Sequence, residues 1–180
     1  MKKLMLFIAV GVLITSSFFL TMCKSTQYSK EIAYVDSLLV VLDKREALLN
    51  EIDTVEIQRD FRIYLDNLDR IREQFTDRDD EETWSIYTRY GLIRKPLRDY
   101  KKNYDEMMVE INYARRQLNA LKENLKHNTY EPDVVEEYIR EETSFVNYID
   151  LTVENLHYNT TRYHNMFKEL NPQVEDLLED

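Results

Sequence analysis

Residues 86–125 read IYTRYGLIRKPLRDYKKNYDEMMVEINYARRQLNALKENL, and this stretch decides the fold. Alternate steps of four and three residues along it meet an apolar or aromatic side chain every time. These positions are Ile86, Tyr90, Ile93, Leu97, Tyr100, Tyr104, Met107, Ile111, Ala114, Leu118, Leu121 and Leu125. Such a seam is typical of a helix that packs side by side with other helices. We therefore predict a helix of about 60 Å, kinked at Gly91 and Pro96 because the seam keeps its register through both. A break near Leu92 is the alternative.

A second helix is predicted over residues 132–172. Its seam consists of Val135, Tyr138, Glu142, Phe145, Ile149, Thr152, Leu156, Asn159, Tyr163, Met166 and Leu170. Pro132 suits the first helical turn and Pro172 suits a stop. Because only residues 127–131 remain for a loop, the two long helices must be antiparallel neighbours.

The region before residue 76 shows two shorter seams that are half a turn out of phase, since nine residues separate Ile52 from Phe61. The seams are Leu38, Leu42, Arg45, Leu49 and Ile52, then Phe61, Leu65, Leu68, Arg72 and Phe75. Asp53 and Glu56 have the spacing of a capping box. We therefore predict a break at Ile52 to Thr54, followed by an acidic turn over residues 76–82 in which Asp79 and Glu82 repeat that spacing.

The composition leaves few places where the chain can turn. There are two glycines and three prolines in 180 residues, and the turn dipeptides that hairpin-rich sheets need are missing. The predicted fold class is therefore all-α: an elongated antiparallel three-layer helical bundle or coiled coil, with the first layer broken near Ile52–Thr54.

The N-terminal segment combines Lys2 and Lys3 with a charge-free run over residues 4–22, which ends in Leu20-Thr21-Met22-Cys23. It resembles a bacterial lipoprotein signal peptide, and the resemblance implies cleavage before Cys23 and lipidation of that cysteine. Met22 is larger than the small residue usual at its position. An uncleaved signal anchor is the alternative, because nineteen uncharged residues reach about 28 Å, enough to span a hydrocarbon core.

This interpretation divides the chain into a signal peptide (1–22), a lipidated tether (23–30), a helical bundle domain (31–172) and an acidic tail (173–180) that we expect to be frayed. The resemblance places the protein in the bacterial cell envelope, anchored to membrane by its N-terminal lipid. Because Lys24 and Ser25 are not acidic, it favours the outer membrane or periplasmic face over the inner membrane. Stability outside the cell must come from packing, since no cysteine follows Cys23.

The charge of the chain bears on its partners. Without Lys2 and Lys3 the chain keeps 22 basic and 34 acidic residues, a net charge of −12. Such a surface disfavours nucleic acid as a partner. Against this background stands one basic run: Arg89, Arg94, Lys95, Arg98, Lys101 and Lys102. These side chains are expected to pair with acids of a neighbouring helix or with nearby acids such as Asp77, Asp79, Asp80 and Glu81. The alternative is a docking patch for lipid headgroups, cell-wall polymer or an acidic partner.

Candidate chemistry is sparse, and we expect no catalytic residue, metal or cofactor. Glu154 and His157 form a lone Glu-x-x-His, with His164 seven residues further on, which makes these three weak candidates for a metal site. Ordinary surface histidines are the default. Trp84, Tyr87 and Tyr90 are spaced for an exposed aromatic patch, although amphipathic packing explains them equally.

Two functions follow from these observations. The first is a lipid-anchored envelope protein whose helical domain binds or scaffolds a protein partner or another copy of itself, without identifiable catalysis. The second is a small metal-binding or enzymatic helical bundle centred on Glu154, His157 and His164. Metal analysis of the purified protein separates the two classes.

Overall fold

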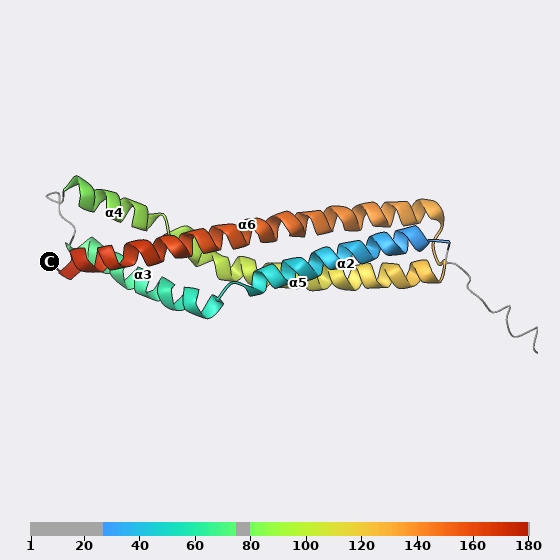
Figure 1. The fold of residues 1–180 in the computed structure, drawn as a ribbon, viewed down its shortest axis with the longest axis horizontal. Coiled ribbons are helices and arrows are strands. Elements are labelled where there is room, and N and C mark those ends of the chain that lie inside the picture. Colours follow the sequence, from blue (N-terminus) through green and yellow to red (C-terminus); the bar gives the residue numbers. More distant parts are fainter. Residues whose placement is uncertain (1–26, 75–79, 180) are drawn as a thin grey trace, which may run out of the picture.

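A computed structural model of the chain describes residues 27–74 and 80–179, and all regular structure within these ranges is α-helical. Figure 1 shows the elements as a long, narrow rod. The helices are α2 (Ser29–Asn50), α3 (Thr54–Gln74), α4 (Glu81–Gly91), α5 (Arg94–Lys126) and α6 (Pro132–Glu179). The predicted all-α, elongated three-layer bundle is confirmed.

The three layers are α2 with α3, α4 with α5, and α6, which runs the whole length of the rod (Figure 1). Three contacts fix how the first and third layers are aligned. Arg45 binds Asp150, Asp60 binds His164 and Asn67 binds Asn171, so the partners are always 104 or 105 residues apart. A constant offset means that α2 and α3 run parallel to α6. The middle layer runs antiparallel to both.

The seam predicted from residues 86–125 forms the centre of the bundle. Ten of its side chains are buried, and Ile86 and Tyr104 are half-buried against the same core. The buried members are Tyr90, Ile93, Leu97, Tyr100, Met107, Ile111, Ala114, Leu118, Leu121 and Leu125. This prediction is confirmed, because an unbroken apolar stripe leaves a helix only one face to bury.

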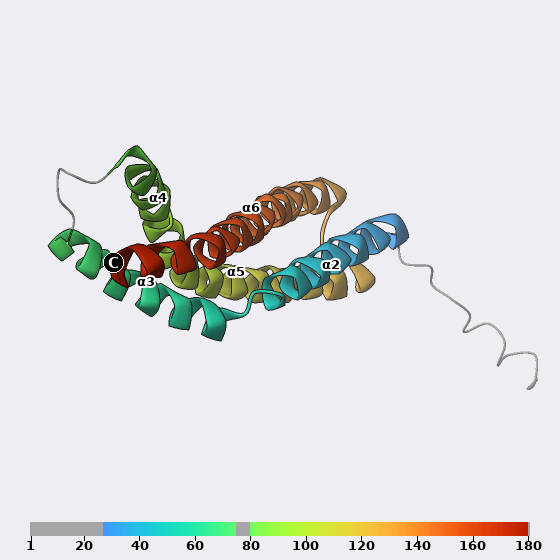
Figure 2. The same cartoon turned by 60° about the vertical axis from the view of Figure 1, so that its left-hand side comes forward.

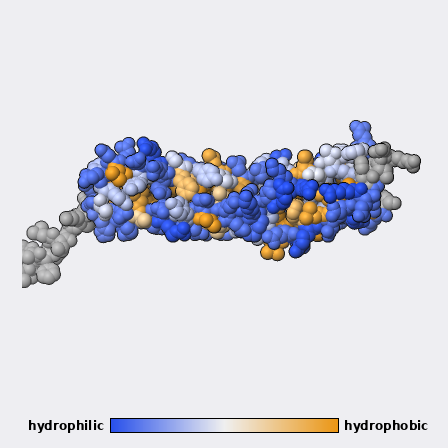
Figure 3. Space-filling view, turned by 180° about the vertical axis from the view of Figure 1, so that it is seen from behind, coloured by the Kyte–Doolittle hydropathy of each residue, from blue (hydrophilic) through white to orange (hydrophobic). Residues whose placement is uncertain are grey.

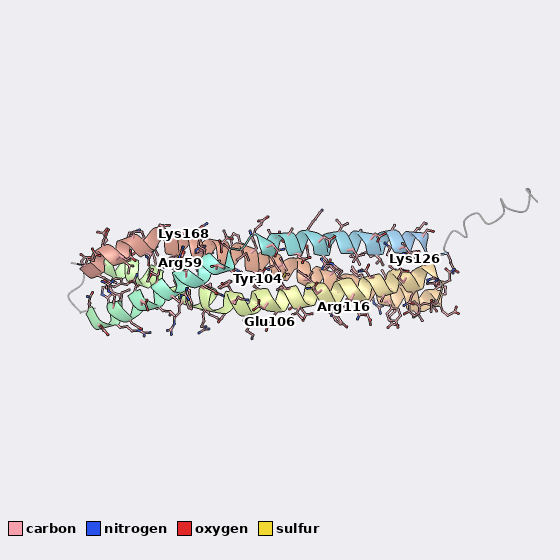
Figure 4. All side chains as sticks on the ribbon, turned by 90° about the horizontal axis from the view of Figure 1, so that it is seen from below. Arg59, Tyr104, Glu106, Arg116, Lys126 and Lys168 are labelled. Atoms are coloured by element: carbon pink, nitrogen blue, oxygen red, sulfur yellow. The ribbon has the colours of Figure 1, made fainter. Side chains whose placement is uncertain are left out.

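The break in the first layer lies where the sequence predicts it, between Asn50 and Thr54. Oδ1 of Asp53 accepts hydrogen bonds from the backbone amides of Val55 (3.1 Å) and Glu56 (2.9 Å), which caps α3. Tyr104 holds the other side of the break, since its hydroxyl lies 3.3 Å from Oδ1 of Asn50. Figure 4 shows Tyr104 close to the junction of α2 and α3.

At Leu92 and Ile93 the chain breaks rather than kinks, so the expectation of one kinked helix over residues 86–125 is wrong. Pro96 has no N–H to give to the carbonyl of Leu92, which removes the hydrogen bond that would join α4 to α5. The junction is instead a tight turn, in which the amides of Leu92 and Ile93 bond three residues back, to Arg89 and Tyr90. Figure 2 shows α4 leaning away from the axis of α5.

The predicted stop at Pro172 is also wrong, and so is the frayed tail over residues 173–179, because α6 continues to Glu179. Val174 and Leu178 are buried in the core, and Arg70 of α3 donates to the carbonyl of Leu178 at 3.2 Å. Proline keeps a helical φ. Packing of the following turn therefore outweighs the single backbone hydrogen bond that Pro172 removes.

The opposite end of the rod is closed by the loop between α5 and α6. Asn128 has a φ of 51° and ends α5 in the left-handed conformation common after helices. Tyr28 is buried and donates from its hydroxyl to the carbonyl of Tyr130 at 2.9 Å. Pro132 opens α6, as predicted. Ser29 and Lys30, expected in the tether, already belong to α2.

The seams of α3 and α6 differ from the predicted ones. In α3 the buried positions are Ile57, Asp60, Tyr64, Asn67 and Ile71, while the predicted Leu65 and Arg72 are exposed. In α6 the buried positions include Val146, Val153, Thr160, His164 and Phe167, while the predicted Tyr138 and Asn159 are exposed. Both seams carry polar residues, which a search for apolar periodicity passes over.

Candidate functional site

A groove of about 570 Å³ lies between α5 and α6 near the middle of the rod. Its floor is made by the buried or half-buried side chains of Met107, Leu156, Thr160 and Tyr163, and most of its rim is polar. Thr152, Asn155 and Asn159 contribute from α6, and Lys95, Asn103 and Glu106 contribute from α5. Tyr148 and Tyr163 also line it. In Figure 4 Tyr104 and Glu106 lie on opposite sides of α5, so the groove faces away from the α2–α3 junction.

The groove offers hydrogen-bonding groups that the protein itself does not use. Within the described residues, the side-chain amides of Asn103, Asn155 and Asn159 make no hydrogen bond to another protein group. An amide presents two donor hydrogens and one acceptor oxygen. The groove is therefore suited to a ligand that carries both donors and acceptors.

A second polar centre is buried between α3 and α6. Nε2 of His164 lies 2.8 Å from Oδ2 of Asp60, and these residues are only 7% and 3% exposed. Arg59 donates to Oδ1 of the same aspartate at 2.7 Å and 2.9 Å. Glu56 completes the centre, with its Oε1 3.0 Å from Nζ of Lys168. Figure 4 shows Arg59 and Lys168 side by side across the two helices.

Electrostatics in this centre favour an ionised aspartate. Burial on its own would raise the pKa of Asp60, but the hydrogen bonds from His164 and Arg59 outweigh it, so the pKa lies below its ordinary value. Both carboxylate oxygens of Asp60 have a protein partner, which is His164 at Oδ2 and Arg59 at Oδ1.

Glu56, Asp60 and His164 also have the donor types of a metal site, with ligand atoms within 4.8 Å of one another. The surrounding charges do not fit a metal well. A divalent cation would have to displace His164 from Asp60 and the ammonium of Lys168 from Glu56, beside the fixed charge of Arg59. The centre thus reads more readily as a buried charge network than as a metal site.

A network centred on two asparagines lies two helical turns further along α3 and α6. Oδ1 of Asn171 accepts from the hydroxyl of Tyr90 at 2.7 Å and from Nδ2 of Asn67 at 3.1 Å. Its own Nδ2 donates to Glu175 at 2.9 Å. The hydroxyl of Tyr64 lies close by, with the Tyr64 and Tyr90 rings 4.8 Å apart, and burial raises the pKa of Tyr64 to about 12. These contacts tie α3, α4 and α6 together.

The three histidine-site candidates named from the sequence do not come together. Glu154 is exposed, and His157 lies 3.3 Å from Oε2 of Glu51 at the α2–α3 junction. His164 instead belongs to the buried network with Asp60, so the expectation of an ordinary surface histidine is wrong for it.

Most of the basic run is paired with acids, but only Arg89 pairs with a neighbouring helix as expected, and the other pairs lie within α5. Arg89 reaches Glu169 of α6 at 2.8 Å. Arg98, Lys101 and Lys102 pair along α5 with Asp99, Asp105 and Glu106. Within the described residues Arg94 and Lys95 take part in no ion pair, and Lys95 lines the groove. Of the acids named as partners, Asp77 and Asp79 lie outside the described residues, and Asp80 caps α4 by accepting from the amide of Thr83.

The aromatic patch expected as an alternative does not form as a unit. Trp84 is 49% exposed, but Tyr90 is fully buried in the core. Exposed apolar side chains are instead scattered, and the face seen in Figure 3 carries them as separate patches among hydrophilic residues. Tyr148, beside the groove, stacks on Phe145 with 6.4 Å between ring centroids.

The sequence does contain a signal for the buried polar residues that was missed. Asp60 and Asn67 are seven residues apart in α3, and His164 and Asn171 are seven apart in α6. Two polar pairs with the same heptad spacing on neighbouring helices indicate a matched polar seam. The groove residues carry no such signal, because exposed asparagines occur on most helices.

Cys23, the predicted lipidation site, lies outside the described residues. Among the helices described, none combines the length and the apolar character that crossing a membrane requires. Comparisons with protein-family models, curated proteins and solved structures found no match.

Proposed function

We propose that this protein is a lipid-anchored component of the bacterial cell envelope, whose helical rod binds or scaffolds a protein partner. The observation that carries the binding role is the groove between α5 and α6, with its unused amides and its position in the middle of an elongated rod. The anchor is supported by Leu20-Thr21-Met22-Cys23 at the end of a charge-free run.

The length of the tether and the position of the groove along the rod suit a membrane-anchored binding protein. Four residues separate Cys23 from Tyr28, the first buried residue of the described chain. The five steps from Cys23 to Tyr28 span at most about 18 Å. The base of the rod therefore stays close to the membrane. The α6 residues of the groove begin sixteen residues after Pro132, which is about 24 Å along the helix. A rod standing upright would present the groove well clear of lipid headgroups.

Metabolic labelling tests the anchor. Cells that express the full-length chain are grown with a clickable palmitate analogue, alongside cells that express Cys23→Ala. The proposal expects label on the wild-type protein, no label on the variant, and slower migration of the variant because its leader is retained. An unlabelled wild-type protein that migrates like Cys23→Ala supports the uncleaved signal anchor instead.

Metal binding is the second candidate, because Glu56, Asp60 and His164 are grouped as potential ligands. Equilibrium dialysis with Zn²⁺ tests it, using the purified wild-type protein and Lys168→Ala. If the group is a metal site, removal of the competing ammonium should tighten Zn²⁺ binding. If it is a charge network, neither protein should bind Zn²⁺ in a stoichiometric manner.

A further inference from the structure

We propose that the groove between α5 and α6 binds an extended polypeptide segment that carries a carboxylate at the Lys95 end. This inference rests on the binding role proposed above, but not on the lipid anchor. It names the class of partner and the residues that would recognise it.

The first argument is the spacing of the amides. Asn155 and Asn159 both line the groove and are four residues apart on α6, a rise of about 6 Å. An extended chain repeats every two residues, which is about 6.6 Å. Both amides can therefore pair with peptide groups on the same side of an extended segment, because the mismatch is within the reach of side-chain rotation.

The second argument is the length of the groove and the amide on its opposite wall. Along α5 its lining runs from Lys95 to Met107, which is about 18 Å and matches five or six residues of extended chain. Asn103 adds an amide from the opposite wall. A helical ligand would leave these amides unpaired, because its backbone groups bond to one another.

The third argument is charge. Asp99 is held by two hydrogen bonds from Arg98, at 2.7 Å and 3.1 Å. Glu106 at the other end lies 3.6 Å from Lys102. Lys95 takes part in no ion pair within the described residues, and it interacts only through space with Asp99, whose carboxylate Arg98 already holds. With Arg94 and Arg98 beside it, this end of the groove therefore carries more positive than negative charge. The carboxylate at the C-terminus of the bound segment complements it.

The rings at the groove supply the remaining contacts. Tyr148 and Tyr163 give apolar surface next to hydroxyls, and tyrosine is favoured at sites that bind peptides by combined stacking and hydrogen bonding. Specificity would come from which side chains of the segment fit beside the rings. The amides would recognise the backbone whatever its sequence.

Fluorescence anisotropy on the detergent-solubilised full-length protein tests the proposal. The probe is a fluorescein-labelled positional library of hexapeptides with free C-termini, and its twin is the same library with amidated C-termini. We expect saturable binding of free-carboxyl pools, at least tenfold weaker binding of their amidated twins, and a loss of this preference in Lys95→Ala.

The double variant Asn155→Ala/Asn159→Ala should weaken peptide binding at least tenfold. Asn165→Ala removes an exposed asparagine of the same helix outside the groove and should bind as the wild type does. Circular dichroism melts show that each variant is folded. Binding that is equal in the double variant and Asn165→Ala would overturn the proposal, as would no binding by any pool.

A glycan ligand is the competing class for the same groove. If cell-wall oligosaccharides bind saturably, lose affinity in the double variant and are not displaced by the peptide pools, the peptide assignment is wrong. If the groove does not bind peptide, the proposed function can still be tested, because a partner crosslinked to another face of the rod would support scaffolding without this groove. Absence of palmitate label would reject the anchor and leave the groove untouched.

Discussion

The contact between Asp60 and His164 shows how single residues decide the packing of this bundle. Neither residue is apolar, yet both are buried, because each supplies the hydrogen-bond partner that the other needs at 2.8 Å. Removing one partner leaves a buried polar group or charge uncompensated, which costs more than the pair contributes as a whole.

His164→Ala and Asp60→Ala are each expected to destabilise the protein by roughly 3 kcal/mol. The double variant should lose less than the sum of the two, with a coupling of about 1 to 3 kcal/mol. Urea unfolding at pH 7, followed by circular dichroism, gives all three values. Strictly additive losses would show that the two side chains act independently and contradict the pairing.

The same pair predicts an acid dependence. Because the pKa of Asp60 is lowered in the folded protein, its stabilising contribution is present above its ordinary value of 3.8 and is lost as the pH falls through the lower folded pKa. The loss caused by Asp60→Asn should therefore be largest at neutral pH and shrink below about pH 4. A loss that is unchanged at pH 3 would contradict this.

The pKa of Glu142 is shifted in the opposite direction. Its Oε2 is buried without a hydrogen-bond partner among the described residues, and burial, with Glu141 adding to it, raises its pKa. Its charge therefore destabilises the fold as the pH rises above the ordinary value of 4.5. Glu142→Gln should raise stability at pH 7 by on the order of 1 kcal/mol, or about 2 to 4 °C in Tm.

Calorimetry at two pH values checks this prediction. At pH 7 the variant should melt above the wild type, and at pH 4 the two should converge, because the glutamate is then largely protonated. Glu141→Gln is the matched control, since Glu141 is exposed and should shift Tm less. Equal gains at both pH values would show that charge is not the cause.

At the scale of elements, the sequence predicted the helices well where apolar residues alone form the seam. The α5 seam is the clearest case, because no polar residue interrupts it from Leu97 to Leu125. Prediction from apolar periodicity failed for α3, because Asp60 and Asn67 occupy its seam. These positions become interior only when α6 brings His164 and Asn171 opposite them, more than 100 residues away. Local periodicity cannot contain that information.

The ends of the helices show the same division. The break at Asp53 was predictable, because the cap is formed by residues two and three positions away. The continuation of α6 through Pro172 was not, because it depends on Val174 and Leu178 packing into the core. The groove could not be predicted from the sequence either, since it depends on how α5 and α6 are placed side by side.

Pro172→Ala should therefore stabilise the protein. Alanine restores an amide that can bond to the carbonyl of Lys168, and it removes the clash between the proline ring and that carbonyl. Because Pro172 is solvent-exposed but lies in the interior of the helix, we expect a gain in stability of about 1 to 3 kcal/mol. Pro132→Ala is the control, because Pro132 stands in the first turn, where the missing amide costs little. Urea unfolding that shows a loss for Pro172→Ala would mean that α6 needs a bend there.

The whole molecule is a rod, and this has a direct consequence in solution. The 48 residues of α6 reach about 72 Å, and a uniform rod of that length has a radius of gyration of about 21 Å. A compact domain of about 158 residues would give about 15 Å. Small-angle X-ray scattering from the protein without its leader should give at least 20 Å for the monomer. A value near 15 Å would contradict the extended fold.

The rod also has two unlike halves. Where α2 packs on α5 and α6, the buried side chains are apolar, as Leu42, Leu118 and Ile149 illustrate. The buried polar residues of the described chain lie toward the other end, on α3 and the C-terminal part of α6: Asp60, Asn67, Thr160, His164 and Asn171. Apolar burial contributes about 25 cal/mol per Å², whereas paired polar groups contribute little net stability.

Hydrogen exchange should therefore distinguish the halves. Amides of α3, α4 and residues 164–178 are expected to exchange roughly tenfold or more faster than those of residues 38–49 and 111–125, because the polar half opens first. Acid should widen the difference as Asp60 becomes protonated, because its lowered pKa means that the polar half loses stability in acid. Equal protection along the rod at pH 7, or a difference that narrows at pH 3, would show that the two halves unfold as one cooperative unit.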